Sequence, residues 1–589
     1  MKQTIILLIF LLLINFTLIG QTLEKKWLTD FEKSNYTATS NYDETINYLK
    51  KLEAASPYIK LITFGQSPQG RQLYAAIVSR QKLFNPSEIK KKGLPILLIQ
   101  NGIHAGEIEG KDACLLLLRD ILITKTKAKY LDNCVLIVIP IFNVDGHERM
   151  SKYNRINQNG PKEMGWRATA QNLNLNRDYM KADSPEMINW LKFFTKWLPD
   201  FFIDTHTTDG ADYQYTITYN ISDGENQYPQ TIEWIKSSLI PYFENKVEKE
   251  GYLIFPYVAF KGSKLEDGLV DWVPTPRFSN GYVPLQNRPA LLIETHMLKS
   301  YKDRVYSTKF LIEAVIEKIN DDSQKLVKMN KDADNWVIEN YFYKKKPLPL
   351  SFSVTDKNKI IIFKGFNSIE KESGITGNKV LVYTNTPVDF NIPFYYDLNV
   401  KDSVYVPKAY LIPKEWNEIV DKLKLHGVII DTVRTSEQAV VEKYKFYDVK
   451  FSNSSFEGHQ RPIYKYNVII DTLRLKKGDY IIRTDQRTLQ IIVNLLEPLS
   501  QDSFIAWGFF NTIFERKEYF EVYSMNKIAE EMISENPKLK EEFLRKLQED
   551  ENFRNNSYMR LMYFYEKSPY SDKYLNQYPV LRIIKELPN

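Results

Sequence analysis

Cysteine and histidine are both scarce in this chain of 589 residues. Its two cysteines, Cys114 and Cys134, are too few for a disulfide scaffold, and both lie in apolar runs. We therefore expect free, buried thiols. The chain also lacks a large excess of one charge: its formal net charge is +6, and acidic and basic residues are interspersed. The absence of a dense Lys/Arg stripe argues against a nucleic-acid partner.

Long apolar runs are lacking beyond the N-terminus, which reads MKQTIILLIFLLLINFTLIGQ. One lysine precedes about fifteen apolar residues, and Gly20 then leads into polar sequence. This pattern predicts a signal peptide over residues 1–20 and an exported protein, periplasmic or secreted, with no stable membrane span after cleavage. The alternative is an uncleaved anchor, although the run is short for a span. Export would also permit a disulfide between the two cysteines.

The chain length predicts two or three domains. Residues 21–335 alternate apolar strands with amphipathic helices, which is typical of an α/β domain with a mixed, mostly parallel sheet flanked by helices. The segment KKKPLPL then indicates a linker. Residues 346–589 predict an accessory region of mixed, β-rich structure with a charged helical tail.

Three of the predicted strands end in polar side chains. PILLIQNGIH leads into His104 and Glu107, FFIDTH ends at His206, and ALLIETH contains Glu294. In open α/β sheets, ligands bind beyond the carboxyl ends of the strands, so these side chains could form one site. A hydrolytic zinc site takes three ligands from histidine and carboxylate, and His104, Glu107 and His206 supply that set. We expect the His-x-x-Glu pair at the start of a helix, where residues three apart share a face.

Further motifs lie between the two predicted ligand segments and in the same order as in a known family. Over residues 30 to 320 the chain resembles the zinc metallocarboxypeptidases of the carboxypeptidase A type, in particular large exported bacterial members. The matching positions, besides the strand ends, are Asn143 to Gly146 (NVDG), Trp166, Arg167, Asn176 and Arg177. AYLIPKEW, LKLHGV and NLLEPLSQDSFIAWGFF also resemble the C-terminal extension of such members, for which we expect a structural or substrate-shaping role.

The resemblance implies a catalytic metal and a general base. One zinc ion per chain would be held by His104, Glu107 and His206. Glu294 would take a proton from the attacking water and pass it to the leaving amine. Arg167 would stabilise the oxyanion of the tetrahedral intermediate.

The resemblance also implies a peptide substrate with a free C-terminal carboxylate. Asn176 and Arg177 would receive that carboxylate, a task that suits the guanidinium fork. The activity implied is that of a zinc-dependent carboxypeptidase. Two alternatives stay open: a zinc amidohydrolase acting on cell-wall or other non-standard peptide amides, and a catalytically inactive peptide-binding protein on the same fold.

The chain departs from the family at two places. Asn174 stands where these enzymes often have an aspartate that supports a zinc-binding histidine. No tyrosine stands about twenty residues before the general base, where the family has a mobile one; Tyr282 is the candidate, and a packing role is equally expected. We expect Asp204 on the same strand face as His206. The remaining histidines, expected to be structural or supporting, are His147, His296, His426 and His459.

Overall fold

The computed structural model describes residues 25–585 except 209, 263, 436 and 437, so the predicted signal peptide lies outside the described residues. The contacts divide the chain into two compact units. The first contains the chain as far as Pro407 together with Asn417–Ile430 and Ile482–Ser503, and the second contains Lys408–Trp416, Asp431–Ile481 and Phe504–Asn589. The predicted boundary at residue 335 therefore does not coincide with either unit. None of the described helices combines the length and apolar character needed to cross a membrane.

The first unit is built around a mixed sheet of eight strands, in the spatial order β1-β2-β4-β3-β5-β10-β6-β7. The four central strands β4, β3, β5 and β10 run parallel, whereas β6 is antiparallel to β10, as are β1 to β2 and β2 to β4. This confirms the predicted α/β fold class. The strands are β1 (Ile59–Gln66), β2 (Gln72–Val78), β3 (Ile96–Gln100), β4 (Val135–Ile139), β5 (Phe201–Thr208), β6 (Ile217–Ile221), β7 (Ile254–Pro256) and β10 (Ala290–His296).

Helices cover this sheet, which explains why its central strands read as continuous apolar runs. Strand β3 is buried at every position, as is β4. The helices of the first unit are α2 (Asp30–Lys33), α3 (Tyr42–Ala55), α4 (Pro86–Lys91), α5 (Glu109–Leu122), α6 (Val144–His147), α7 (Pro185–Trp197), α8 (Pro229–Trp234), α9 (Ile240–Lys249), α10 (Ser279–Leu285), α11 (Tyr301–Asp321), α12 (Ser323–Val337), α13 (Asn417–Leu425) and α14 (Leu489–Leu496). Cys114 and Cys134 are free and buried in this core, as predicted.

Local sequence sets where these helices begin. Helix α3 starts with a capping box in which the Asn41 side chain accepts from the backbone of Glu44 and the Glu44 carboxylate accepts from the backbone of Asn41. Helix α7 starts after Ser184, whose side chain accepts from Met187 N, and Pro185 follows at the first helical position. Apolar faces then pack inward: Trp190 in α7 is fully buried.

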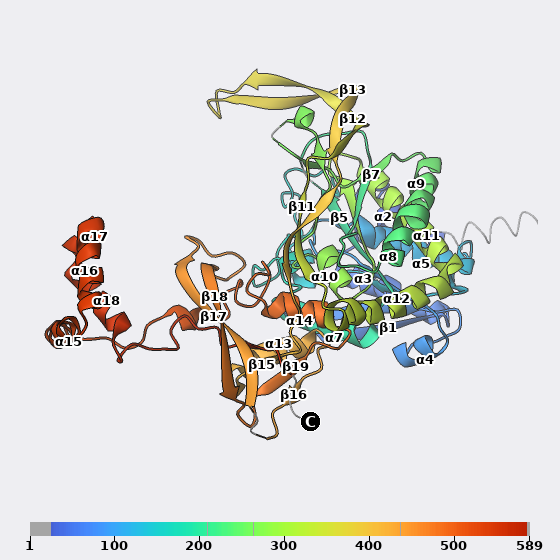
Figure 1. Cartoon of the computed structure of the whole chain (residues 1–589). Coiled ribbons are helices and arrows are strands. Elements are labelled where there is room, and N and C mark those ends of the chain that lie inside the picture. The colour runs from blue at the N-terminus through green and yellow to red at the C-terminus, as the bar shows by residue number, and fades with distance from the viewer. Residues whose placement is uncertain (1–24, 209, 263, 436–437, 586–589) are drawn as a thin grey trace, which may run out of the picture. The chain divides into compact units, whose positions relative to one another are not determined.

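The first unit also carries β strands outside the central sheet. The long hairpin of β12 (Asn358–Glu372) and β13 (Lys379–Tyr395) is drawn in yellow in Figure 1 and is extended by β9 (Leu269–Val270) and β8 (Ala259–Phe260). Strand β11 (Leu348–Val354) pairs with β14 (Leu398–Val404). The β-rich texture predicted after residue 346 is thus observed.

The second unit holds a six-stranded sheet, of whose strand β19 it includes the residues up to Ile481, and a helical tail. The sheet consists of β15 (Ala409–Ile412), β16 (Asp431–Thr432), β17 (Gln438–Phe451), β18 (Pro462–Arg474), β19 (Tyr480–Arg483) and β20 (Leu581–Ile583). The tail contains α15 (Val522–Glu535), α16 (Pro537–Glu549), α17 (Glu551–Asn555) and α18 (Ser557–Lys567). These helices pack around an apolar cluster of their own that includes Met525 and Phe564.

Candidate metal centre and surrounding site

The first candidate ligands lie in a turn between β3 and α5. The Glu107 backbone N–H donates to the His104 carbonyl at 2.9 Å, and α5 begins two residues later at Glu109. The His-x-x-Glu pair is therefore held by a tight turn and not by the helix we expected. Gly102, with φ +66°, turns the chain out of β3 into this segment.

Two glycines in HAGEIEG allow close packing around the turn. A Cβ on Gly110 would lie 2.1 Å from Thr205 Oγ1, so α5 rests directly on β5. A Cβ on Gly106 would lie 2.8 Å from the Gly165 carbonyl oxygen. The glycine spacing thus brings the turn against the strand that carries His206.

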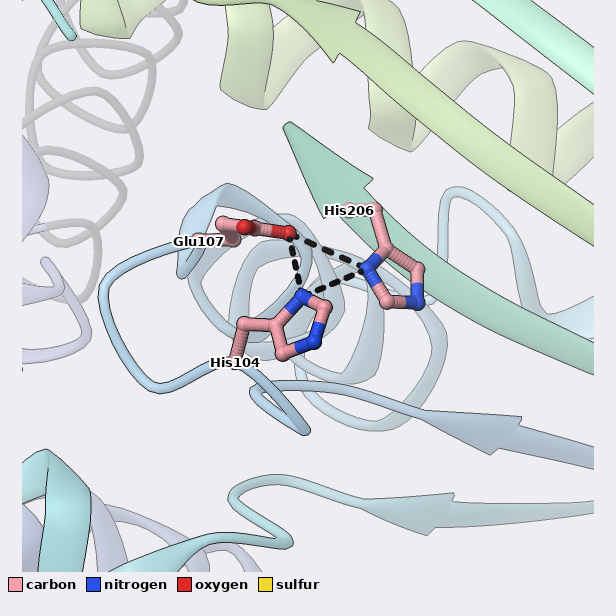
Figure 2. A group of neighbouring side chains, drawn as sticks. All are labelled: His104, Glu107 and His206. Carbon is pink, nitrogen blue, oxygen red and sulfur yellow. Dashed lines mark hydrogen bonds and ion pairs between the residues drawn. The ribbon is translucent and has the colours of Figure 1, made fainter. Parts of the chain in front are cut away.

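Figure 2 shows the three candidate ligands converging on one point from β5 and the β3–α5 turn. His104 Nδ1 lies 3.1 Å and His206 Nδ1 lies 3.0 Å from Glu107 Oε2, and the two Nδ1 atoms are 3.2 Å apart. All three side chains are buried. They form the one group of three or more potential metal ligands found among the described residues.

Each imidazole is oriented through its other nitrogen. His206 Nε2 lies 2.9 Å from Asp204 Oδ2, and the other oxygen of Asp204 accepts from Gln100 at 3.0 Å. His104 Nε2 lies 3.1 Å from Asn174 Oδ1, which also accepts from the backbone N–H of Asn176 at 3.0 Å. Asn174 therefore occupies the supporting place that an aspartate often holds in the family, and Asp204 shares the face of His206 as expected.

Electrostatics at this point favour a cation. Burial alone would raise the pKa of Glu107, but His104 and Arg155 outweigh it and hold that pKa well below its usual range. Burial opposes charge on His206, yet the carboxylates of Asp204 and Glu107 raise the pKa of His206 well above its usual value. At His104 burial prevails and lowers the pKa to about 4. The carboxylates therefore stabilise positive charge at the centre of the group.

The donor set fits zinc. When Nε2 of each imidazole donates to its oxygen partner, both Nδ1 lone pairs and a carboxylate oxygen face one another, and a bound metal ion would satisfy all three. Ligands about 2.0–2.1 Å from a tetrahedral zinc lie roughly 3.3 Å apart, close to the separations of these atoms. Two imidazoles and one carboxylate match a catalytic site that keeps a position for water.

Glu294 lies beside this group on the neighbouring strand. It is paired with His206 in the parallel ladder between β10 and β5. The side chain is buried, and its Oε2 has no hydrogen-bond partner within the described part of the chain. Burial raises the pKa of Glu294 to about 8, opposed by His206 and reinforced by Glu107. A buried carboxyl group with a free oxygen next to the three ligands is suited to proton transfer.

Two arginines contact the outer oxygen of Glu107. Arg167 Nη1 lies 3.0 Å and Arg155 Nη1 lies 2.7 Å from Glu107 Oε1. The Arg167 side chain keeps 43% of its surface exposed, whereas that of Arg155 keeps 11%. Arg167, predicted from the sequence, is thus at the site and accessible from solvent. Arg155 was missed, because no spacing sets it apart from other arginines in the loop that contains it.

The predicted carboxylate-binding pair lies on the 3₁₀ turn Leu175–Arg177. The Arg177 guanidinium stands 4.3 Å from the centre of the Phe278 ring. The Asn176 side-chain oxygen accepts from the backbone N–H of Ser279 at 3.1 Å. Asn176 also follows directly on the turn that holds Asn174 against His104. Both residues are therefore tied to the metal group on one side and to the start of α10 on the other.

The structure does not place Tyr282 at the site. Its side chain is fully buried and packs against Tyr179 and Trp190, with ring centres 5.6 and 6.2 Å away. Its hydroxyl lies 3.0 Å from His426 Nδ1. Tyr282 is thus a packing aromatic, and the expectation of a mobile substrate-binding tyrosine at this position is wrong. His426 is its buried partner, in agreement with the structural role expected for this histidine.

The other histidines have partners outside the group of three ligands. His147 contacts Lys111 at 3.2 Å and Glu148 at 2.8 Å. His296 accepts from the backbone N–H of Tyr213 at 3.2 Å. His459 belongs to the second unit and packs near Trp507 and Phe509.

The sequence matches known proteins over the segment that carries this site. Residues 45–341, half of the chain, match the family described as zinc carboxypeptidase. Carboxypeptidase 2 of Trichophyton rubrum is 23% identical over 495 residues, covering 81% of this chain and 85% of that protein. Carboxypeptidase 2 of Trichophyton equinum is 22% identical over 494 residues with the same coverage. The crystal structure of carboxypeptidase A from Helicoverpa armigera aligns with 50% of this chain and 74% of its own, at 14% identity and a TM-score of 0.36.

Proposed function

The chain belongs to the zinc carboxypeptidase family, and we propose that it is an exported, zinc-dependent metallocarboxypeptidase that hydrolyses the C-terminal peptide bond of peptides. The observation that carries the proposal is the convergence of His104, Glu107 and His206, with Glu294 beside them. Export rests on the N-terminal sequence pattern.

Three residues would hold the ion, one zinc per chain: His104, Glu107 and His206. Bound there, zinc supplies Lewis-acid polarisation of the scissile carbonyl and activation of a water. The residues fit this role because their inward atoms are all lone-pair donors and their outward atoms are fixed by Asn174, Asp204 and the arginines.

The remaining residues move a proton and stabilise charge. Glu294 takes a proton from the attacking water and returns it to the nitrogen of the leaving amine, so the peptide bond breaks and an amine and a carboxylate form. Burial makes its carboxylate a stronger proton acceptor than that of an exposed glutamate. Arg167, which is accessible and beside Glu107, stabilises the oxyanion that develops on the carbonyl oxygen.

Asn176 and Arg177 receive the terminal carboxylate of the substrate. Arg177 offers planar, bidentate donors, and the Asn176 side chain is fixed by Ser279. Because this contact exists before the transition state, Arg177→Ala should mainly raise KM, whereas Arg167→Ala should mainly lower kcat.

The test compares one peptide with a free C-terminal carboxylate and the same peptide with a C-terminal amide. We expect the free peptide to be hydrolysed, the amide to be hydrolysed much more slowly, and Glu294→Gln to lose about 10²–10⁴-fold in kcat. Equal rates on both peptides would contradict a carboxypeptidase and favour the amidohydrolase alternative. Zinc binding without hydrolysis of either peptide would favour the inactive binding protein.

A further inference from the structure

We propose that Asp502, far along the chain from the metal ligands, is a positioning residue for the substrate carboxylate site. It acts through Arg277 and the start of α10, both of which belong to the same compact unit as Asp502. The inference rests on the proposed function, because it assigns a part in substrate binding to a residue that does not touch the substrate.

Asp502 binds Arg277 at two places. Its Oδ1 lies 2.7 Å from Arg277 Nε, and its Oδ2 accepts from the Arg277 backbone N–H at 3.1 Å. Asp502 is fully buried, and the Arg277 side chain keeps 12% exposure. A buried carboxylate that contacts both the side chain and the main chain of one residue fixes that residue's backbone and not just its charge.

The residues directly after Arg277 support the carboxylate-binding pair. Phe278 lies beneath the Arg177 guanidinium, at 4.3 Å, and the Ser279 backbone N–H donates to Asn176 Oδ1 at 3.1 Å. A backbone shift at residue 277 is therefore transmitted to both side chains that bind the substrate carboxylate.

The same segment has little room to adjust by itself. A Cβ on Gly281 would lie 2.1 Å from the Thr275 carbonyl oxygen, so the chain before Arg277 lies directly against α10. The Phe278 backbone N–H also donates to the Thr275 carbonyl at 3.1 Å. The turn is tight, and Asp502 supplies the charged contact at its centre.

A second buried ion pair of the same unit lies elsewhere and offers a comparison. Arg288 and Asp334 form a comparable pair, with Nη1 to Oδ1 and Nη2 to Oδ2 both 2.9 Å. That pair joins the segment before β10 to α12 and contacts neither Arg177 nor Asn176. Asp334→Asn is therefore the matched control for loss of a buried ion pair.

The experiment measures KM and kcat of the full chain loaded with zinc, on the free peptide and on its C-terminal amide. Asp502→Asn should raise KM for the free peptide about tenfold, because a small displacement of Arg177 weakens carboxylate binding, and should leave kcat within about twofold. Rates on the amide should hardly change. Asp334→Asn should lower the unfolding midpoint without changing KM.

A double-mutant cycle separates this role from general destabilisation. If Asp502 acts through Arg177 and Asn176, Asp502→Asn should raise KM less in the Arg177→Ala background than in the wild type. Additive effects, or equal losses on the free peptide and the amide, would overturn the inference. Should Asp502→Asn fail to fold, Arg277→Gln removes the same ion pair from the other side and must show the same rise in KM. If the wild type hydrolyses the free peptide faster than the amide but KM is unchanged in these variants, only this inference is contradicted. If the wild type does not distinguish the two peptides, the proposed function itself is contradicted.

Discussion

The two imidazoles of the metal centre are oriented by oxygens of different charge. Asp204 presents a carboxylate to His206, whereas Asn174 presents an amide oxygen to His104. A charged acceptor makes the opposite ring nitrogen a stronger donor to a metal than a neutral acceptor does. His104 is therefore the less strongly supported of the two histidine ligands.

This asymmetry predicts opposite effects from two isosteric substitutions. Asp204→Asn should weaken zinc affinity about 10–100-fold, and Asn174→Asp should strengthen it, because the added charge raises the basicity of His104. Competition with a chelator measures both, with Gln72→Glu, away from the site on β2, as a control for added charge. Equal zinc affinity in all four proteins would show that these oxygens do not support the ligands.

A buried carboxyl group away from the metal centre predicts how stability depends on pH. Glu186, near the start of α7, is fully buried, and its burial raises the pKa to about 7, with Asp145 and Asp178 adding to the shift. Since the pKa is higher in the folded state, the stabilising contribution of Glu186 is complete below its ordinary pKa near 4.5 and is lost as the pH rises through about 7.

In the wild type, the free energy of unfolding should fall as the pH rises between these values. Glu186→Gln should remove the part of this fall that comes from Glu186. At pH 8 the variant should be more stable than the wild type by about 1–3 kcal/mol, and at pH 4 the two should be nearly equal. Denaturant unfolding at several pH values measures this difference. A variant that is less stable than the wild type at pH 8 would contradict the assignment.

At the scale of elements, the site depends on how closely α5 approaches β5. Gly110→Ala should force the two apart, because its Cβ would lie 2.1 Å from Thr205 Oγ1 and 2.4 Å from Asn101 Oδ1. We expect a loss of stability of about 1–3 kcal/mol, as for other overpacked cores, and weaker zinc binding because the turn of His104 and Glu107 precedes α5.

Gly374→Ala is the control for this substitution. A Cβ at Gly374 would meet no atom within 4 Å, so the change should be nearly neutral. Thermal unfolding and zinc retention should be measured for both variants. A Gly110→Ala protein that matches Gly374→Ala in both would show that α5 can move without disturbing the site.

The strand ends of the site could be predicted from the sequence because the pattern that marks them lies within a few neighbouring residues. His206 and Glu294 each come at the end of a continuous apolar run, and parallel strands bring such ends to one edge of the sheet. The turn that holds His104 could not be predicted, since it depends on the close approach of Gly106 to Gly165.

Contacts between distant parts of the chain could not be predicted from the sequence either. Arg155 and the pair of Arg277 with Asp502 have no spacing that marks them, because their partners are separated by 48 and 225 residues. The position of Tyr282 before Glu294 makes it a candidate for the site, whereas its burial beside Trp190 and His426 decides its role.

At the scale of the whole molecule, the catalytic unit is not one continuous segment. Helix α14 is buried at every position, and Arg487 donates to both the backbone and side-chain oxygens of Gln286, at 3.1 and 2.9 Å. His426 lies 3.0 Å from the Tyr282 hydroxyl. The segments 417–430 and 482–503 therefore complete the core behind α10.

A chain that ends at residue 345 should consequently fail to fold as a stable unit, although it contains every predicted site residue. Within the full chain, Leu495→Ala in α14 should cost about 2–5 kcal/mol, as expected for a large-to-small change at a fully buried position. Denaturant unfolding measures both. A truncated chain that unfolds cooperatively at the same midpoint as the whole protein would contradict this division of the chain.

The central claim, that the β3–α5 turn and the end of β5 together hold one catalytic metal ion, is tested most directly by the zinc content of the purified protein. We expect one zinc per chain in the wild type, loss of zinc in His104→Ala and His206→Ala, and full retention in His459→Ala, whose ring packs in the second unit. Equal zinc in all four proteins, or no stoichiometric zinc in the wild type, would contradict the account.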